Sequence, residues 1–421
     1  MVAAAPAPTP DTATPLILMI APQPFFRVTG TPLNVLAMCR ALTGSGLAVH
    51  LLTVPYGDDV DLPGLTLHRV ARLPGCGPLP VGFSVAKLAY NGLLALAFLR
   101  LLRRRRFAAV HAIEEAAFWA VPLARRRGIP GIVDLDSDLC RQLRDQGSGL
   151  GRMLAAPAGW LRRFALRRAA AALTVSRTLS EIARAERPGI PVFEINDIPI
   201  ESASRQPDDE GMAALRARFG LAGRRLVVYT GNFDRRQGLP ELIQAMATVR
   251  DRHPQCLLLV VGGEPAQVEA LQARIEADGL GDGVRLVGAQ PPDAMPEYMG
   301  LAEVLVSPRL EPYTTPLKIF SYMASGRPIV ATDLPTHTQV LDAEAAILVP
   351  PTPAGLADGI LRALEDPAGA AALGRRARQV VKTRYTFAGF KRRLADCYAA
   401  VLGPTKSLSH SGRRAEHRAH G

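Results

Sequence analysis

The sequence contains little cysteine and few aromatic residues. Its five cysteines, among 421 residues, lie far apart, form no Cys-x-x-Cys pair and are odd in number. This usage argues against a disulfide framework or a cysteine zinc site, and it favours a reducing compartment. Aromatic residues make up only 5% of the chain. Because no known nucleic-acid-binding module is recognisable either, we expect no nucleic-acid partner.

Long hydrophobic runs are also lacking. The longest, at 88–99, is interrupted by Asn91 and followed by Arg100, so it is too short to span a bilayer. Residues 1–14 are rich in Ala, Pro and Thr, without the basic and apolar stretches of a secretion signal. We therefore expect a disordered N-terminal tail and a cytoplasmic location.

The excess of positive charge lies in the N-terminal half of the chain and in the C-terminal tail. Residues 1–200 carry 23 Lys and Arg against 14 Asp and Glu, residues 207–402 carry 22 against 22, and residues 403–421 carry four against one. A one-sided positive field suits an anionic partner.

Two Arg-rich helical patterns indicate what that partner could be. An apolar pattern at 85–102 is followed by four arginines at 103–106, and a second pattern combines Trp160 and Phe164 with four arginines between 162 and 168. Apolar faces bordered by arginines favour peripheral binding to an anionic membrane surface, such as the inner face of the cytoplasmic membrane. Core helices with solvated ends are the alternative.

Short apolar runs alternate with helical patterns twice along the chain. The first set has strands at 16–20, 47–54, 110–112, 132–135, 173–175 and 192–195, and the second has strands at 226–230, 256–261, 284–287, 304–306, 329–331 and 347–349. This alternation is typical of α/β proteins and predicts two Rossmann-like, doubly wound parallel-sheet domains facing a cleft. The predicted segments are a tail (1–14), an N-terminal domain (15–200), a linker (201–211), a C-terminal domain (212–385), a C-terminal helix (386–402) and a disordered basic tail (403–421).

The segment 306–333 is the most informative about chemistry. It predicts a strand, a loop at 311–316, a helix at 317–324, a tight turn and another strand. A helix N-terminus offers unpaired N–H groups and partial positive charge, which suits an anion. Lys318 in the first turn opposes the helix dipole, at a cost of a few tenths of a kcal/mol, roughly. A bound phosphate would compensate this cost, whereas the alternative is a solvated surface lysine.

Several glycine turns accompany this segment in a recognisable order. They are Gln23-Pro24-Phe25-Phe26 with Gly30-Thr31-Pro32, then Val228-Tyr229-Thr230-Gly231-Asn232-Phe233, then Gln237-Gly238-Leu239-Pro240-Glu241-Leu242, and then Val260-Val261-Gly262-Gly263. Together with the segment 306–333, this ordered set resembles the retaining GT-B-fold glycosyltransferases of family 4, also called glycosyl transferases group 1. The resemblance covers roughly residues 16–400.

The resemblance implies a sugar transferred from a nucleotide-diphosphate sugar to a hydroxyl of a glycan, lipid or lipid-linked acceptor. It also implies that the N-terminal domain (15–200) is Rossmann-like and acceptor-binding, and that the C-terminal domain (212–385) is Rossmann-like and nucleotide-sugar-binding. It implies no cofactor beyond that donor substrate and no metal. The donor-binding residues that it implies are Gly30, Gly231, Asn232, Arg235, Arg236, Gly288, Glu311, Thr314, Thr315, Leu317, Lys318 and Ser321.

These residues have different implied roles. Gly30, Lys318 and the amides near 314–317 would hold the diphosphate, with Lys318 stabilising the leaving group. Glu311 would accept hydrogen bonds from sugar hydroxyls, or would instead cap the following helix. Gly288 would lie against the base.

The chain departs from the family pattern within this set. Ser321 stands where the family commonly has a second glutamate, and Asn232 and Gln237 stand where it has an arginine and a lysine. Arg235 and Arg236 are near enough to substitute, or are two solvated loop arginines. These changes put donor affinity and nucleotide preference in question.

The N-terminal domain supplies the expected acceptor side. His111 ends a predicted strand, and the second histidine of the family's His-x-His is replaced by Ile113. His111, Glu114 or both would orient or deprotonate the acceptor hydroxyl, although a histidine at a strand end is often only structural. We expect Asp136 to bind the acceptor.

Asp134, Asp136 and Asp138 alternate along the chain. Three carboxylates could form a magnesium site, although the resemblance implies none.

The sequence is also compatible with two other hypotheses about function. The altered motif positions would also suit a catalytically silent nucleotide-sugar-binding subunit of a glycan-assembly complex. The other hypothesis is an epimerase or a phosphorylase with the GT-B fold, which the sequence favours less. Slow hydrolysis of a donor sugar separates the enzyme from the silent subunit.

Overall fold

The structure, a computed structural model, describes residues 14–26, 30–75, 85–145, 149–312 and 315–403. It consists of two compact units. The first unit comprises residues 1–175, 179–195 and 391–421, and the second comprises residues 176–178 and 196–390. Most of the two expected tails, residues 1–13 and 404–421, lies outside the described residues.

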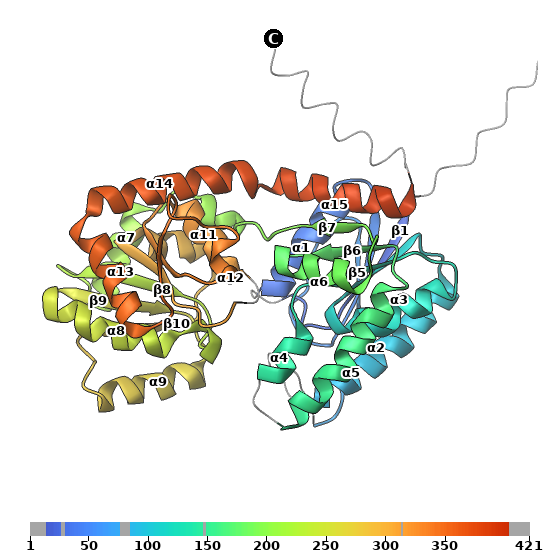
Figure 1. Ribbon diagram of the computed structural model, residues 1–421, viewed down its shortest axis with the longest axis horizontal. Coiled ribbons are helices and arrows are strands. Elements are labelled where there is room, and N and C mark those ends of the chain that lie inside the picture. The colour runs from blue at the N-terminus through green and yellow to red at the C-terminus, as the bar shows by residue number, and fades with distance from the viewer. Residues whose placement is uncertain (1–13, 27–29, 76–84, 146–148, 313–314, 404–421) are drawn as a thin grey trace, which may run out of the picture. The chain divides into compact units, whose positions relative to one another are not determined.

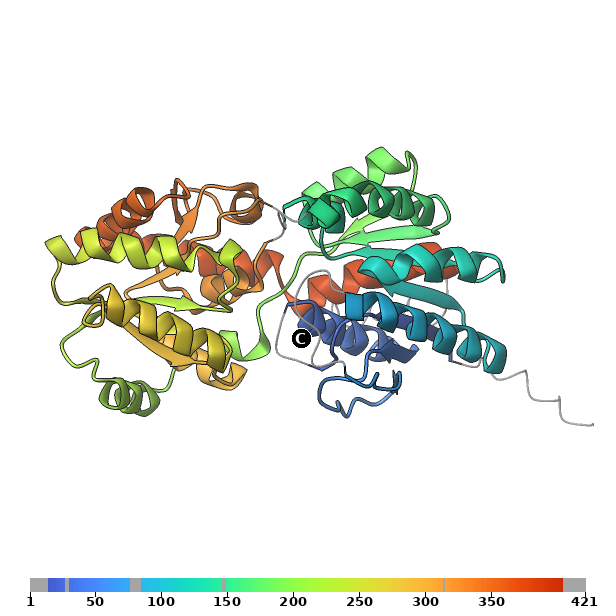
Figure 2. The ribbon, with the colours of Figure 1, turned by 90° about the horizontal axis from the view of Figure 1, so that it is seen from below.

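The first unit contains a seven-stranded parallel sheet (Figure 1). In the order β3-β2-β1-β4-β5-β6-β7, its strands are Leu65–Arg69, Ala48–Thr53, Leu16–Ala21, Ala109–Ile113, Gly131–Leu135, Ala171–Thr174 and Val192–Glu194. Its helices are α1 (Gly30–Thr43), α2 (Val85–Arg104), η1 (Glu114–Ala116), α3 (Ala117–Arg125), α4 (Leu139–Asp145), α5 (Gly149–Leu166) and α6 (Arg177–Glu186), the last of which begins in the second unit. Every residue of β4 and β5 is buried, as expected where helices cover both faces of a parallel sheet, and Figure 2 shows this layering.

The second unit contains a six-stranded parallel sheet. In the order β10-β9-β8-β11-β12-β13, its strands are Val284–Gly288, Cys256–Val261, Arg225–Thr230, Val304–Ser307, Ile329–Thr332 and Ile347–Val349. Its helical segments are η2 (Glu201–Ser204), α7 (Asp209–Phe219), η3 (Arg235–Gln237), α8 (Leu239–Arg252), α9 (Pro265–Ala277), η4 (Pro292–Ala294), α10 (Met295–Gly300), α11 (Leu317–Ser325), α12 (Pro335–Thr338), α13 (Pro353–Glu365) and α14 (Pro367–Arg384).

The prediction of two doubly wound parallel-sheet domains is confirmed. In each sheet the strand order reverses next to the first strand, between β1 and β4 in one and between β8 and β11 in the other. Ligands of such sheets bind beyond the carboxyl ends of the strands at this reversal. Those two sheet edges are therefore where functional side chains are to be sought.

Two segments differ from the expected layout. The stretch 201–211, expected as a linker, contains η2 and the start of α7 and belongs to the second unit. The last helix, α15 (Phe387–Leu402), begins in the second unit and continues into the first from Lys391 onward. The first unit is thus completed by the end of the chain.

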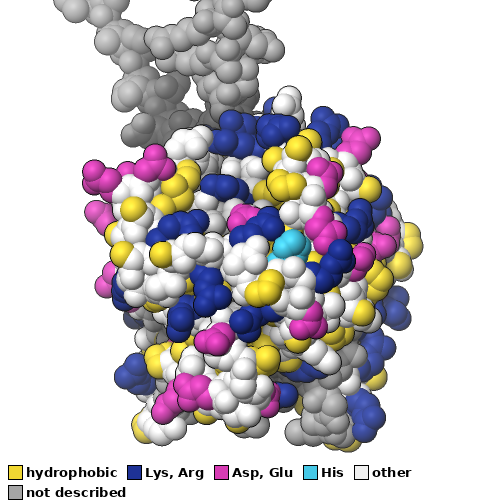
Figure 3. All heavy atoms as spheres, turned by 90° about the vertical axis from the view of Figure 1, so that its left-hand side faces the viewer, with side chains coloured by type: hydrophobic (Ala, Val, Ile, Leu, Met, Phe, Trp, Pro, Cys, Tyr) yellow, Lys and Arg dark blue, Asp and Glu magenta, His cyan; other side chains and the backbone are white. Residues whose placement is uncertain are grey.

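The surface of the second unit has no large field of one sign on the face that Figure 3 shows, where Lys and Arg alternate with Asp and Glu. This mixture agrees with the equal numbers of acidic and basic residues in 207–402. None of the helices in the described part of the chain combines the length and the apolar character needed to cross a membrane.

Candidate active site

Three neighbouring strands of the second sheet end in glycine turns. Gly231 follows β8, Gly262 and Gly263 follow β9, and Gly288 ends β10, all four with positive φ. The turns are tied together, because Gly231 N donates to Val261 O at 2.9 Å and Gly262 N donates to Gly288 O at 2.8 Å. Only glycine adopts these conformations freely. A Cβ at Gly231, Gly262 or Gly263 would collide with neighbouring atoms, so these three glycines allow the turns to pack closely together, whereas the space beside Gly288 is open.

Lys318 lies beside these glycine turns, in the first turn of α11. Its Nζ is fully buried, has no hydrogen-bond partner among the described residues and lies 3.8 Å from the ring centroid of Tyr229. A Cβ on Gly231 would come within 2.7 Å of this Nζ. Burial, and then the positive charge of Arg309, hold the pKa of Lys318 well below its usual value. A buried ammonium without a partner is costly, so this group is suited to binding an anion.

The N-terminus of α11 presents main-chain donors beside Lys318. The N-cap residue is Pro316, which places no side chain on the first amides, and the first turn contains no acidic residue. The N–H groups of Leu317 and Lys318 have no acceptor within the helix. Thr315 Oγ1 accepts a hydrogen bond from Gln339 Nε2 at 2.8 Å, whereas the predicted donor residue Thr314 lies outside the described residues.

The two loop arginines that we expected to bind the donor each form an ion pair with an acidic residue. Arg235 pairs with Glu241 at 2.7 Å, and Arg236 makes two bonds of 2.8 Å to Asp234. Glu311 Oε2 lies 3.9 Å from Arg236 Nε, so this carboxylate belongs to the same cluster. Asn232 shapes the turn, since its carbonyl accepts from the Tyr229 hydroxyl at 2.7 Å.

One buried cation of this edge was not predicted. Arg309 lies two residues after the end of β11, is only 8% exposed, and its Nε has no hydrogen-bond partner in the described part of the chain. Burial and the nearby charge of Arg236 lower its pKa. A charged residue just beyond a fully buried strand was the signal that could have identified it.

Ser321 and Gly288 complete the predicted donor residues of this unit. The Oγ of Ser321, one turn after Lys318 on α11, is buried without a partner among the described residues. Gly288 has no atom within 4 Å of the position that a Cβ would take, so its surroundings are open.

In the first unit, His111 is part of the core. Its ring is fully buried in β4, with Nε2 3.0 Å from Asp134 Oδ2 and Nδ1 2.8 Å from the Tyr398 hydroxyl of α15. Direct action on an acceptor would need an exposed ring nitrogen, and this ring has none. The catalytic role predicted for His111 is therefore not supported, because both nitrogens serve the fold.

Glu114 occupies the adjacent end of β4 in an unusual conformation. Its φ of 50° is in the left-handed region, which costs a residue with a side chain about 1–3 kcal/mol and is found mostly at functional sites. Its carboxylate accepts from Gln23 Nε2 at 2.8 Å and from Ser137 Oγ at 2.7 Å. Burial, and then the charge of Glu114, raise the pKa of the neighbouring Glu115 to about 7.

The other predicted residues of this unit lie around the same sheet edge. Asp136 follows β5 and is nearly buried, 3.5 Å from Asn34 Nδ2 of α1. Gly30 is the exposed first residue of that helix. Asp136 and Asn34 thus lie beyond the carboxyl ends of the central strands, where an acceptor is expected.

The alternating aspartates do not converge. Asp134 is bonded to His111, and Asp138 pairs with Arg162 at 2.7 Å. Within the described ranges, no three His, Cys, Asp or Glu side chains are grouped so that they could hold a metal ion.

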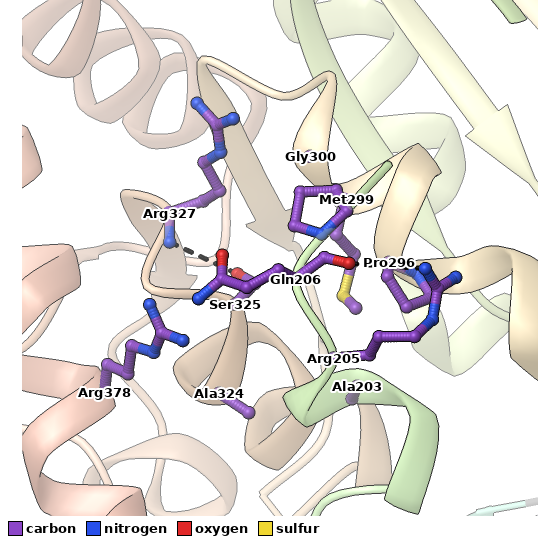
Figure 4. Close-up of a pocket in the computed structure, with 11 residues that line it drawn as sticks. Ala203, Arg205, Gln206, Pro296, Met299, Gly300, Ala324, Ser325, Arg327 and Arg378 are labelled. Atoms are coloured by element: carbon purple, nitrogen blue, oxygen red, sulfur yellow. Dashed lines mark hydrogen bonds between the residues drawn. The ribbon is translucent and has the colours of Figure 1, made fainter. Parts of the chain in front are cut away.

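A small pocket of about 20 Å³ lies elsewhere in the second unit, between η2, α10 and the carboxyl end of α11. Arg205, Arg327 and Arg378 line it, and Figure 4 shows their guanidinium groups pointing apart. Arg205 is paired with Glu297 at 2.7 Å. Because the pocket is at the opposite end of α11 from Lys318 and its cations do not converge, we place the candidate donor site at the glycine turns.

Comparison with known proteins agrees with this geometry. The family model "Glycosyl transferases group 1" matches residues 224–366, and "Glycosyl transferase 4-like domain" matches residues 29–192. An alpha-D-kanosaminyltransferase of Streptomyces kanamyceticus is 30% identical over 389 residues, which are 88% of this chain and 99% of that protein. A phosphatidyl-myo-inositol mannosyltransferase of Mycobacterium leprae is 26% identical over 88% of this chain and 90% of its own.

A solved structure shares the fold. The sucrose-phosphate synthase of Thermosynechococcus elongatus superposes with a TM-score of 0.74 at 23% identity, covering 91% of this chain and 98% of that one. The group 1 match covers the second sheet with its glycine turns and Lys318, and the 4-like match covers most of the first sheet. The chain therefore belongs to the group 1 glycosyltransferases, family 4 with the GT-B fold, and is a glycosyltransferase.

Proposed function

We propose that this glycosyltransferase takes a sugar from a nucleotide-diphosphate sugar and transfers it, with retention of anomeric configuration, to a hydroxyl of a glycan, lipid or lipid-linked acceptor. The observation that carries the proposal is the buried ammonium of Lys318, which has no hydrogen-bond partner among the described residues and packs against the glycine turn at Gly231. The names of the relatives support the transfer of a hexose-like sugar, and one of them names a phosphatidylinositol acceptor.

The second unit supplies the leaving-group side of the reaction. The Lys318 ammonium and the first amides of α11 bind the diphosphate where negative charge develops as the sugar departs. These donors are fixed before the substrate arrives, so little reorganisation is needed during the reaction. The glycine turns allow the nucleotide to approach the main chain closely.

The first unit supplies the acceptor side. Glu114 is held by Gln23 and Ser137 in a fixed orientation, and its carboxylate accepts a hydrogen bond from the attacking hydroxyl. Asp136 binds a second acceptor hydroxyl. No cofactor and no metal is part of this proposal.

The proposal is tested by incubating the protein with UDP-, GDP- and ADP-sugars and following donor hydrolysis and transfer. We expect slow hydrolysis of one donor, with the freed sugar first appearing in the donor's anomeric configuration by NMR. The Lys318→Met variant should lose this activity, whereas Arg235→Gln, which alters an exposed ion pair, should keep it. Inverted product, or equal activity of Lys318→Met, would contradict the proposal.

The alternative of a catalytically silent subunit is not favoured, because the relatives matched over most of their length are named as transferases. If the protein binds a nucleotide but hydrolyses none of the donor sugars, the hypothesis of a catalytically silent subunit would be favoured instead.

We also propose that the first unit binds an anionic membrane surface. Exposed apolar side chains occur on the solvent faces of α2 and α5, at Leu88 (57% exposed), Leu96 (52%), Met153 (66%) and Trp160 (62%). Both helices end in arginines, which would meet anionic headgroups while the apolar side chains enter the interface.

Vesicle sedimentation tests this second proposal. Vesicles containing phosphatidylglycerol should retain the protein and release it at high salt, and vesicles of phosphatidylcholine alone should not retain it. Leu96→Gln combined with Trp160→Ser should weaken retention, whereas Phe387→Ser, on another exposed apolar residue, should not. Equal retention by both vesicle types would show that the arginines are not involved.

A further inference from the structure

Four cations lie around the glycine turns of the second unit, and two of them are already neutralised. Arg235 is 68% exposed at its side chain and paired with Glu241. Arg236 is held by both carboxylate oxygens of Asp234, and this bonding lowers the pKa of Asp234. A bidentate arginine–carboxylate pair has little remaining attraction for a further anion.

Arg309 and Lys318 are different. Arg309 is buried, Lys318 is half-buried with its Nζ buried, and neither forms an ion pair with a described residue. Each has a buried nitrogen without a hydrogen-bond partner in that part of the chain, Nε in Arg309 and Nζ in Lys318. The positive charge of Arg309 acts on Lys318, since it contributes to the lowered pKa of the lysine.

The position of Arg309 is fixed by the main chain around it. Its carbonyl accepts from Thr332 Oγ1 at 2.6 Å, and the next amide, Leu310 N, donates to Arg236 O at 3.0 Å. Pro308, just before it, packs so closely on Gly238 that a Cβ there would overlap the Pro308 carbonyl. These contacts fix the main chain at Arg309. Its charge acts on Lys318 and is itself affected by Asp234 and Arg236 of the loop after β8, so it lies near both.

Asp234 and Glu311 lie near enough to raise the pKa of Arg309, but burial and the charge of Arg236 outweigh them, and neither carboxylate forms an ion pair with Arg309. Two buried cations of like charge that form no ion pair are unfavourable on their own. A ligand with at least two negative charges would remove this penalty for both. The planar guanidinium binds two phosphate oxygens at once, and the ammonium binds as a point charge, so the pair suits two linked phosphates.

We propose that Arg309 is a second diphosphate-binding cation of the donor site and that, with Lys318, it makes the site select diphosphates over monophosphates. The proposal rests on the function proposed above, whose donor is a nucleotide-diphosphate sugar. It assigns to Arg309 the role that the sequence suggested for Arg235 and Arg236.

Inorganic pyrophosphate tests this role independently of the nucleotide base and of turnover. Titration calorimetry with pyrophosphate and with phosphate should show tighter binding of pyrophosphate to the wild type. Arg309→Gln should weaken pyrophosphate binding about 10- to 100-fold, the range for a charged hydrogen bond, with a smaller effect on phosphate. Arg309→Lys should recover part of the loss.

Arg235→Gln is the matched control, because it removes an arginine of the same region whose charge is already paired. It should leave pyrophosphate binding within about twofold of the wild type. The unfolding temperature of each variant without ligand, together with Arg309→Lys, separates lost binding from lost folding.

Failure of this inference is distinguishable from failure of the proposed function. If wild type does not bind pyrophosphate, or Arg309→Gln binds it as the wild type does, the inference is overturned even where donor sugars are turned over. If pyrophosphate binding depends on Arg309 but no donor sugar is hydrolysed, the inference stands and the proposed reaction does not.

Discussion

The residues at the candidate donor site combine burial, charge and missing partners. Lys318, Arg309 and Ser321 each bury a polar atom without a hydrogen-bond partner among the described residues. Native proteins satisfy most buried polar atoms, so a concentration of exceptions at one sheet edge indicates a function rather than a structural role.

The first prediction concerns the cost of the buried ammonium. Lys318→Met should raise the free energy of unfolding of the ligand-free protein by about 1 kcal/mol, because it removes a buried charge that has only a cation–π contact with Tyr229 and forms no ion pair. Urea unfolding of both proteins measures the change. A loss of stability would mean that the contact with Tyr229 outweighs the cost of burying the ammonium.

The lowered pKa of Lys318 also predicts how binding depends on pH. The free ammonium loses its proton at lower pH than an ordinary lysine, and a bound anion would restore its pKa. Diphosphate affinity should therefore fall as pH rises through the free-state pKa, with proton uptake on binding. Calorimetry in buffers of different ionisation enthalpy measures this uptake, and Lys318→Arg, which stays charged, should abolish it.

The carboxylate of Glu114 is expected to affect the rate of sugar transfer. Glu114→Gln keeps the shape of the side chain but removes its basicity, so we expect kcat to fall about 100-fold, as for loss of a general base. Ser137→Ala removes only one hydrogen bond to that carboxylate and should cost far less. Similar losses from both variants would indicate an orienting role alone.

Among the elements, the glycine turn after β8 is the one on which the site depends most. A Cβ at Gly231 would meet Lys318 Nζ at 2.7 Å and the Tyr229 hydroxyl at 3.2 Å. Gly231→Ala should therefore displace the lysine and weaken nucleotide binding by about tenfold or more. Gly279→Ala, also at positive φ but with no atom within 4 Å, is the control for backbone strain alone.

His337 connects β11, β12 and α12. Its Nδ1 donates to Thr332 O at 2.8 Å, its Nε2 accepts from Ser307 Oγ at 2.9 Å, and burial lowers its pKa to about 3. The unfolded state binds this proton below about pH 6.5, so stability should decline as pH falls from about 6.5 to 3. His337→Gln should have a shallower decline when unfolding is measured across that range.

Most of the elements that the sequence predicted contain an apolar run. All six residues of β9 are buried, and its residue range is the one expected. The edge strand β3 was not predicted, because its sequence, LTLHR, contains no apolar run. Helix α7 buries no residue, and only its caps, Asp208 and the left-handed Gly220, indicate it.

At the scale of the whole molecule, what the sequence could not show is which distant residues meet. The burial of His111 depends on Tyr398, 287 positions later, which returns to the first unit in α15. Local patterns carry no information on such a contact. Lys318, by contrast, was identifiable because its position at a helix N-terminus is a local property.

The contribution of α15 to the first unit is itself testable. Tyr398→Phe removes the hydroxyl that serves His111 Nδ1 and should destabilise the protein by about 1–2 kcal/mol, the cost of an unsatisfied buried group. Thermal unfolding monitored by a probe in the first unit measures this loss. Unchanged stability would mean that the buried histidine does not need this partner.

The central claim is that Lys318 holds the diphosphate of a nucleotide sugar, and nucleotide-dependent stability tests it most directly. The free energy of unfolding of the wild type and of Lys318→Met should be measured with and without UDP, GDP and ADP. One diphosphate at about 100 times its Kd should stabilise the wild type by about 2.7 kcal/mol and leave Lys318→Met nearly unchanged. Equal stabilisation of both proteins, or stabilisation of neither by any of the three, would contradict the claim.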